Sequence, residues 1–216
     1  MASRVITHDS IDEDVRYVVG VDVAYMHDTA FAAAVMFDRA KRRAVHESYS
    51  TCRVYIPYIP GLLFLREAAP MLMAIRELDE WISCSECNDH YLLLIDGNGM
   101  LHPRLFGLAS YIGLMTDSPA IGVSKSLLCG EVSKGSGMVM LNGREVGRVI
   151  EYNGKRIYVS IGHKISLDTA ERIVRSLITR RSASALGSGS GSVSGVMPEP
   201  LRLAHNAAST LRRSQA

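Results

Sequence analysis

The sequence predicts a mixed α/β fold in which three antiparallel strands are followed by parallel strands, with helices flanking the sheet. Three observations carry this prediction. Apolar, β-branched runs bounded by turn residues recur through the first half of the chain. A long helical periodicity over 62–81 then precedes further apolar runs that alternate with helical segments. Two Asn-Gly pairs in the second half indicate hairpins.

Bulk properties favour one domain. The chain has 216 residues, of which 47% are hydrophobic and 21% charged, with a formal net charge of +2. That charge is too small to indicate nucleic-acid binding by itself. No apolar run reaches the roughly 18 residues of a membrane span. The N-terminus also lacks the basic-then-apolar order of a secretory signal. We therefore expect a cytoplasmic, soluble monomer with no membrane contact.

Composition divides the chain into four segments. Residues 1–14 are polar and acidic and are expected to be disordered, whereas 15–181 carry the periodic elements of the main domain. Residues 182–196 are rich in Ser, Gly and Ala and predict a flexible loop. Residues 197–216 predict a basic C-terminal helical segment that packs on the same domain through Leu201, Leu203, Ala204 and Ala207.

The first apolar run contains an acid. We expect antiparallel strands over 15–24, 31–37 and 44–52, and Asp22 interrupts the β-branched run of the first. A buried carboxylate is costly unless it is paired or binds a metal. The alternative is an acid at the exposed end of the strand.

The loop and helix that follow carry two more candidates. Pro57-Tyr58-Ile59-Pro60-Gly61 is a stiff loop that holds an aromatic and an aliphatic side chain. Such side chains can open a base step as a wedge, although a plain rigid connector has the same composition. Glu67 lies early in the helix expected over 62–81, where an acid is commonly favoured by the helix dipole alone.

A buried strand then runs into a second acid. Tyr91–Ile95 is followed by Asp96, two glycines at 97 and 99, and the motif His102-Pro103-Arg104. A strand that ends in an acid and a glycine-rich turn places that acid at the carboxyl edge of a sheet, where ligands bind. Glycine lets the backbone approach a ligand closely.

The second half adds two polar side chains at element ends. Lys125 follows a strand expected at 120–123 and suits contact with a phosphate, or is simply a solvated lysine. His163 lies where a strand meets a helix capped by Ser166. The other elements expected here are a short helix at 107–115, hairpin strands at 138–141, 144–151 and 155–160, and a helix at 166–180.

Four cysteines include the pair Cys84 and Cys87, with His90 close by. These give three ligands, one fewer than a structural zinc site uses. A local disulfide or two ordinary thiols is the stronger interpretation, and the spacing leaves both open.

Taken together, these segments resemble the endonuclease V family, whose members have an RNase H-like fold. The resemblance spans most of the chain from residue 17 in the family's order. The segments that carry it are Gly20–Tyr25, Pro57–Glu67, Asp96–Gly99, His102–Arg104, Gly107–Ala109, Ile121–Lys125, Tyr158–Ile165 and Pro198–His205. Asn98 stands where many relatives have histidine, and Leu65 where they have an aromatic residue, which bears on fine substrate preference.

The resemblance implies a Mg²⁺ site, with Mn²⁺ as a substitute, formed directly by Asp22 and Asp96 and through water by Glu67. It also implies that Lys125 stabilises the pentavalent phosphate and that His163 orients the nucleophile or assists proton transfer. The remaining implied roles are a lesion wedge of Pro57, Tyr58, Ile59 and Pro60, a base pocket of Gly61, Leu63, Gly97, Gly99 and His102, and Arg104 holding nucleic-acid backbone or bracing the loop.

The implied activity is Mg²⁺-dependent nicking of DNA that contains deoxyinosine, at the second phosphodiester 3′ of the lesion, leaving a 3′-OH and a 5′-phosphate. One alternative is cleavage of inosine in single-stranded RNA by the same site. A junction resolvase of the same fold is disfavoured by the wedge loop. A non-cleaving binder of inosine-containing nucleic acid is disfavoured by the intact acids Asp22, Glu67 and Asp96.

Overall fold

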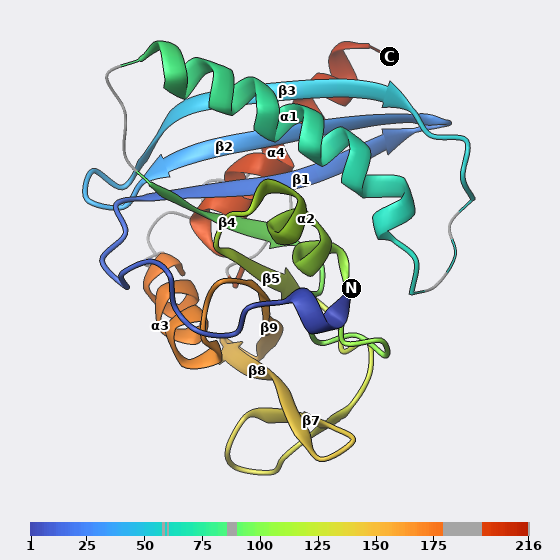
Figure 1. Cartoon of the computed structure of the whole chain (residues 1–216). Coiled ribbons are helices and arrows are strands. Elements are labelled where there is room, and N and C mark those ends of the chain that lie inside the picture. The colour runs from blue at the N-terminus through green and yellow to red at the C-terminus, as the bar shows by residue number, and fades with distance from the viewer. Residues whose placement is uncertain (58, 60, 86–89, 179–195, 216) are drawn as a thin grey trace.

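One mixed β-sheet organises the computed structural model, which describes residues 1–57, 59, 61–85, 90–178 and 196–215 (Figure 1). Within this part of the chain the sheet has nine strands in the order β3-β2-β1-β4-β5-β9-β8-β7-β6. The strands are β1 (Tyr17–Met26), β2 (Thr29–Asp38), β3 (Arg43–Arg53), β4 (Tyr91–Asp96), β5 (Ala120–Ser124), β6 (Glu131–Val132), β7 (Met138–Leu141), β8 (Arg144–Tyr152) and β9 (Lys155–His163).

The predicted strand arrangement is confirmed. β1, β2 and β3 form an antiparallel meander, and β4 pairs in parallel with β1 and with β5. β4 has the predicted bounds. β9 pairs antiparallel with β5 on one side and with β8 on the other, and so joins the hairpin strands to the rest of the sheet. β1 and β4 are buried on both faces, as their continuous apolar runs require.

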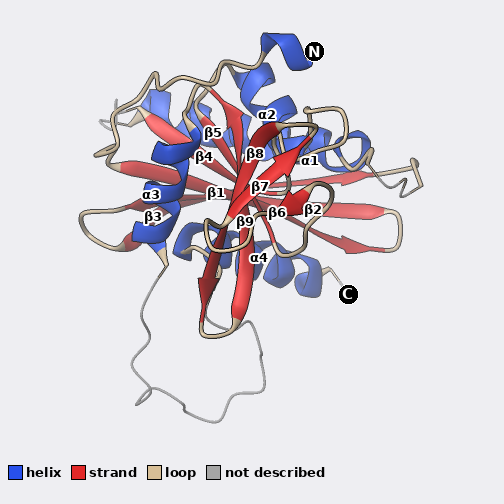
Figure 2. Ribbon diagram, turned by 90° about the horizontal axis from the view of Figure 1, so that it is seen from below, coloured by secondary structure: helices blue, strands red, loops and turns tan. Residues whose placement is uncertain are grey.

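Helices cover both faces of the sheet (Figure 2). Strand alternation assigns the faces: Val19 and Val21 pack with α1 and α2, whereas Val18 packs with α3. α4 packs on β1 and β2 from the α3 side. The helices are α1 (Phe64–Cys84), α2 (Leu108–Thr116), α3 (Leu167–Leu177) and α4 (Glu199–Ser214), with a 3₁₀ turn η1 (Ala2–Arg4) at the start.

The C-terminal helix docks against a glycine on the central strand. Leu201, Ala204 and Ala208 on its inner face are buried. A Cβ at Gly20 would lie 2.2 Å from the carbonyl oxygen of Pro200, so only glycine lets the helix approach this closely. This contact brings the first turns of α4 next to the residues that follow Gly20 on β1.

The N-terminal segment differs from the expectation of disorder over residues 1–14. The amide of Lys164 donates to the carbonyl of Ile6 at 2.7 Å, and the amide of Ile6 donates to His163 Nδ1 at 3.2 Å. Asp9 accepts hydrogen bonds from the backbone and side chain of Ser166 at the start of α3. The polar composition of the segment could not predict these contacts, because each is a single hydrogen bond to a residue more than 150 positions away.

The Ser/Gly-rich loop, of which only Val196 is described, and Cys87 of the cysteine pair fall outside the described residues. Cys52, Cys84 and Cys129 are free thiols. α3 ends at Leu177, three residues short of its predicted end. Of the helices in the described residues, none combines the length and apolarity that crossing a bilayer demands.

Candidate active site

Two acids meet at the carboxyl edge of the sheet. Val21 of β1 pairs in parallel register with Ile95 of β4, so the next residues, Asp22 and Asp96, are neighbours on strands about 4.8 Å apart. Asp22 is 7% exposed, and its Oδ1 accepts the amide of Val23 at 2.8 Å. The parallel pairing of β1 and β4 thus brings together carboxylates 74 positions apart in sequence.

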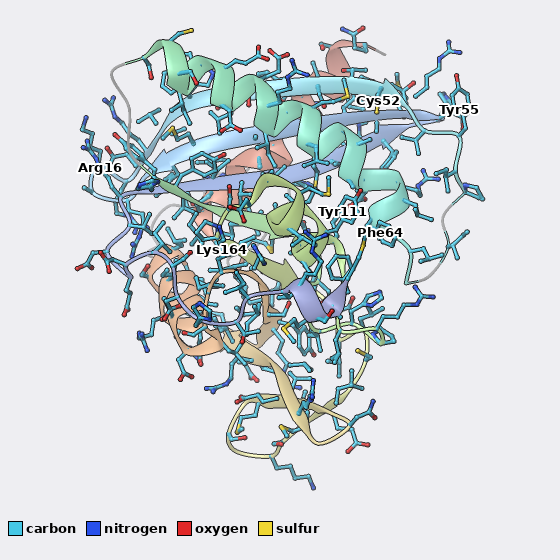
Figure 3. The ribbon with its side chains drawn as sticks, viewed as in Figure 1. Arg16, Cys52, Tyr55, Phe64, Tyr111 and Lys164 are labelled. Atoms are coloured by element: carbon cyan, nitrogen blue, oxygen red, sulfur yellow. The ribbon has the colours of Figure 1, made fainter. Side chains whose placement is uncertain are left out.

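Glu67 supplies a third carboxyl group from the first turn of α1. Burial, together with the negative charges of Asp22 and Asp96, raises its pKa to about 8, against a smaller opposing effect of Arg66. Phe64, one turn earlier, stacks on Tyr111 of α2 with ring centroids 5.2 Å apart, which anchors this end of α1 (Figure 3). Since the three acids influence one another's protonation, they belong to one site.

Two basic side chains, Lys125 and His205, contact the two acids on the strands. Lys125 Nζ lies 3.0 Å from Asp96 Oδ2, and His205 Nδ1 lies 2.8 Å from Asp22 Oδ2. The hydrogen bond to Asp22 raises the pKa of His205. Burial opposes the charge of Lys125, but Asp96 outweighs it, so the Lys125 pKa is raised as well. The acid cluster is therefore partly neutralised by groups of its own chain.

The predicted role of His163 at the acid cluster is wrong, because this residue lies at the other end of the neighbouring strands. His163 pairs with Ala120, at the start of β5, whereas Lys125 follows the end of that strand. Four residues of strand separate the two ends by about 13 Å. The His163 side chain is buried, its Nδ1 accepts the amide of Ile6, and its Nε2 lies 3.8 Å from Asp117. It stabilises the N-terminal segment at the opposite edge of the sheet.

His205 is the site residue that sequence reasoning missed. A signal existed: His205 follows buried Ala204 and lies four residues after buried Leu201, and a residue so placed stays near the docked face of a helix. Deciding which strand that face meets required the contact between Gly20 and Pro200, which no periodicity reveals.

The donor set suits a hard divalent cation. Carboxylate oxygens are the ligands that Mg²⁺ prefers, and it uses one or two of them together with water and phosphate oxygens. In the described part of the chain no three His, Cys, Asp or Glu side chains already converge as ligands. Asp22 and Asp96 are instead turned toward His205 and Lys125. The mutual repulsion that raises the Glu67 pKa is the kind that a cation relieves.

A cavity of about 290 Å³ adjoins the acids. This volume is at the small end of ligand sites in proteins. Four predicted pocket residues, Gly61, Leu63, Gly97 and His102, line it, and Asp96 and Lys125 belong to its wall too. The other lining residues are Phe64, Asn98, Gly107, Leu108, Ser124, Ser126 and Leu128.

Gly99, the fifth predicted pocket residue, is not among those that line the cavity. A Cβ at this position would lie 2.0 Å from the carbonyl oxygen of Ile161 on β9. Its amide donates to Ser160 Oγ at 2.9 Å. Glycine is required here so that the loop after β4 can pack against β9, and the residue acts on the cavity only by positioning its neighbours.

The His-Pro-Arg motif joins two loops. His102 Nδ1 accepts the amide of Arg104, so the proton is on Nε2, which donates to the carbonyl of Gly61 at 3.0 Å. Burial lowers the pKa of His102, which keeps the ring neutral. Arg104 Nη1 donates to the same carbonyl at 3.2 Å. Of the two roles expected for Arg104, the geometry shows loop bracing.

The predicted wedge loop is anchored at both ends. Arg66 donates to the carbonyl of Ile56 before it, and His102 and Arg104 hold Gly61 after it. Pro57 is exposed and the Ile59 side chain is 41% exposed, while Tyr58 and Pro60 lie outside the described residues. Tyr55, just before the loop, also projects from the surface (Figure 3).

Carboxylates on adjacent parallel strands, just past the last paired residues, on a sheet with this antiparallel-then-parallel order define the class of RNase H-like nucleases. A family model described as Endonuclease V matches residues 1–206, and the chain belongs to that family. It is an endonuclease, a phosphodiester hydrolase.

Individual relatives agree. Endonuclease V of Thermofilum pendens is 40% identical over 210 residues, covering 95% of this chain and 82% of the relative. The crystal structure of endonuclease V from Streptomyces avermitilis matches with a TM-score of 0.77 and 31% identity, over 100% of this chain and 90% of that one. Human endonuclease V matches with a TM-score of 0.81 and 26% identity, over 100% and 95%.

Proposed function

We propose that this endonuclease recognises deoxyinosine in DNA and, with Mg²⁺ or Mn²⁺, nicks the second phosphodiester 3′ of the lesion. The products are a 3′-OH and a 5′-phosphate. The observation that carries the proposal is that Asp96 and Lys125 belong both to the acid cluster and to the wall of the adjoining cavity. A base held in that cavity has its own backbone beside the acids.

Asp22 and Asp96 would hold the cation directly and Glu67 through a bound water. Bound there, Mg²⁺ supplies charge neutralisation of the phosphate and lowers the pKa of a water. A positive charge in the cluster would favour the ionised form of Glu67, whose pKa is raised to about 8. Exclusion of bulk water by the buried strand ends strengthens each of these interactions.

Lys125 and His205 act from this chain on either side of the acids. The Lys125 ammonium is half-exposed beside the cavity, so it can leave Asp96 to contact a phosphoryl oxygen that gains charge during attack. His205 holds Asp22 in position, and the hydrogen bond to Asp22 that raises its pKa favours a proton at Nδ1, which the ring can hold or release. These roles replace the one expected for His163.

The cavity receives the extruded base and the wedge fills the gap it leaves. Deaminated pairs cost less to open, which itself favours the lesion. Ile59 is exposed between two anchored loop ends, as a wedge side chain must be. A structural neighbour, endonuclease V of Ciona intestinalis, was crystallised with DNA containing an inosine followed by a ribo-adenosine. At 22% identity that likeness establishes the fold, and the substrate here is argued from the cavity.

The proposed enzyme works as a monomer in the cytoplasm. Every residue assigned to the site comes from one chain, so no second subunit is needed to complete it. Cys52, Cys84 and Cys129 are free thiols, which suits a reducing compartment.

Cleavage of matched DNA and RNA oligonucleotides, each with one inosine, tests the proposal. The protein is incubated with each substrate in Mg²⁺ or in EDTA, and the cleavage site is mapped from the product lengths. We expect a nick in DNA directly after the nucleotide that follows inosine, at the second phosphodiester 3′ of the lesion, and no nick with EDTA. Faster cleavage of the RNA would assign inosine-RNA cleavage instead. Binding without any cleavage would identify a non-cleaving inosine binder.

The variant Tyr58→Ala tests the wedge. It should weaken binding to the inosine oligonucleotide and leave the metal dependence of nicking intact. Unchanged affinity would remove the wedge role from this loop.

A further inference from the structure

We propose that Asn98 selects a 6-keto purine by presenting hydrogen-bond donors to the base in the cavity. The inference rests on the proposed function, because it takes the cavity to be the base site. It assigns the choice between hypoxanthine and adenine to one side chain and to the serine that fixes it. Asn98 lies between the two glycines after Asp96 and lines the cavity wall.

The loop that carries Asn98 is held on both sides. Before it, the amide of Gly97 donates to the carbonyl of Val123 on β5 at 2.8 Å. After it, the amide of Gly99 donates to Ser160 Oγ on β9. The carbonyl of Asn98 itself accepts the amide of Ala109 in the first turn of α2 at 3.0 Å. Asn98 is therefore presented from rigid backbone, as a selective contact requires.

Ser124 determines which part of the Asn98 amide is available. The buried Ser124 hydroxyl has two acceptors within reach of its single proton, Asn98 Oδ1 at 2.9 Å and the carbonyl oxygen of Ser126 at 3.1 Å, and it donates to the nearer, Oδ1. Within the described residues neither the Asn98 main-chain N–H nor its Nδ2 has a hydrogen-bond partner. The only fully buried side-chain N or O atom without a partner in that part of the chain is the Tyr25 hydroxyl. Asn98 Nδ2 therefore keeps solvent contact, and the cavity that Asn98 lines provides it.

The free donors match a keto purine and oppose adenine. Hypoxanthine presents acceptors at O6 and N7, whereas adenine presents an amino donor in place of O6. Asparagine usually reads adenine by accepting from the amino group and donating to N7. Here the hydrogen bond from Ser124 turns Oδ1 toward that serine and leaves Nδ2 as the unpaired end of the amide, so the amino group of adenine would meet a donor in place of an acceptor. Guanine shares O6 and N7, so Asn98 does not reject guanine, whose stronger pairing keeps it in the duplex.

Three single-stranded DNA oligonucleotides of one sequence test the inference. They carry inosine, adenine or nebularine, a purine with hydrogen at position 6, at the same position. Single-turnover cleavage with Mg²⁺ gives the rate ratio of inosine to nebularine. We expect about three- to tenfold for the native protein, the effect of one neutral hydrogen bond.

Substitutions at Asn98 and Ser124 should change that ratio in a defined order. N98A should lower it, and N98D should lower it further because an acceptor replaces the donor at nearly the same shape. N98H should retain it, since a ring N–H can donate. S124A should raise the relative rate on adenine, because it frees Asn98 Oδ1 to accept from the amino group. N206A, at an exposed position of α4, is the matched control.

The outcomes distinguish failure of the proposed function from failure of the role assigned to Asn98. If the native protein leaves the inosine oligonucleotide intact, the proposed function fails. If it cleaves inosine and both N98A and N98D keep the native ratio, the role of Asn98 is overturned while the function stands. Thermal melting shows which variants fold, and N98D and S124A, which change few atoms, serve if N98A does not.

Discussion

His205 occupies the place beside the acids that the sequence suggested for His163. The paired variants H205A and H163A test this assignment. H205A removes the hydrogen bond from Nδ1 to Asp22 Oδ2 at 2.8 Å. A hydrogen bond to a charged group contributes about 1.5–3 kcal/mol. The imidazole is 38% exposed, so the lower value applies, which corresponds to at least about a tenfold loss in nicking rate. If His205 also moves a proton, the loss reaches about 10² to 10⁴.

H163A should show the opposite profile. His163 is 1% exposed and accepts the amide of Ile6, so its removal leaves a cavity and an unpaired donor. We expect the unfolding free energy to fall by about 2–3 kcal/mol and nicking by the folded fraction to stay near the native rate. The assay is single-turnover nicking of a labelled inosine oligonucleotide, with urea unfolding in parallel. An inactive, fully stable H163A beside an active H205A would refute the assignment.

Three further outcomes are expected. D96A should abolish Mg²⁺-dependent nicking and leave binding of the inosine oligonucleotide measurable by fluorescence anisotropy; persistent nicking would move the site elsewhere. G99A should lower the melting temperature sharply, because its Cβ would lie 2.0 Å from the Ile161 carbonyl oxygen. An unchanged melting temperature would show that the loop backbone can shift to accommodate a side chain. Burial opposes the charge of Asp9, but hydrogen bonds from Ser166 and Thr169 outweigh it and lower its pKa. Its contribution is therefore present above an unfolded pKa of about 3.9 and is lost as pH falls below that value. D9N should lower the melting temperature at pH 7, and the difference from the native protein should shrink toward pH 2–3; a constant difference would contradict this.

Hydrophobic patterning was sufficient to predict the sheet. The runs that became β1 and β4 are apolar on both faces, which central parallel strands require, and both end near an acid. Asp96, the last residue of β4, and Lys125, which follows β5, lie at the edge where the patterning put them, because the strand ends determine their position. Four of the thirteen residues that line the cavity were predicted as pocket residues, and that prediction came from the family resemblance.

Contacts between distant segments were beyond the same reasoning. Whether the end of β9 lies at the catalytic edge depends on its antiparallel pairing with β5, which places His163 beside Ala120. The position of His205 depends on how closely α4 approaches Gly20. Whether residues 1–14 are ordered or disordered depends on individual hydrogen bonds such as those of Asp9. None of these contacts leaves a periodic signal in the sequence.

Cation binding by the acid cluster is the central claim, and Mn²⁺ titration followed by electron paramagnetic resonance measures it without catalysis. The native protein should bind Mn²⁺ in competition with Mg²⁺, and a variant carrying D22N and D96N should lose that binding while keeping its fold. Asp22 and Asp96 must exchange His205 and Lys125 for the ion, so H205A should alter the affinity as well. Equal Mn²⁺ binding by the native protein and the double variant would contradict the account.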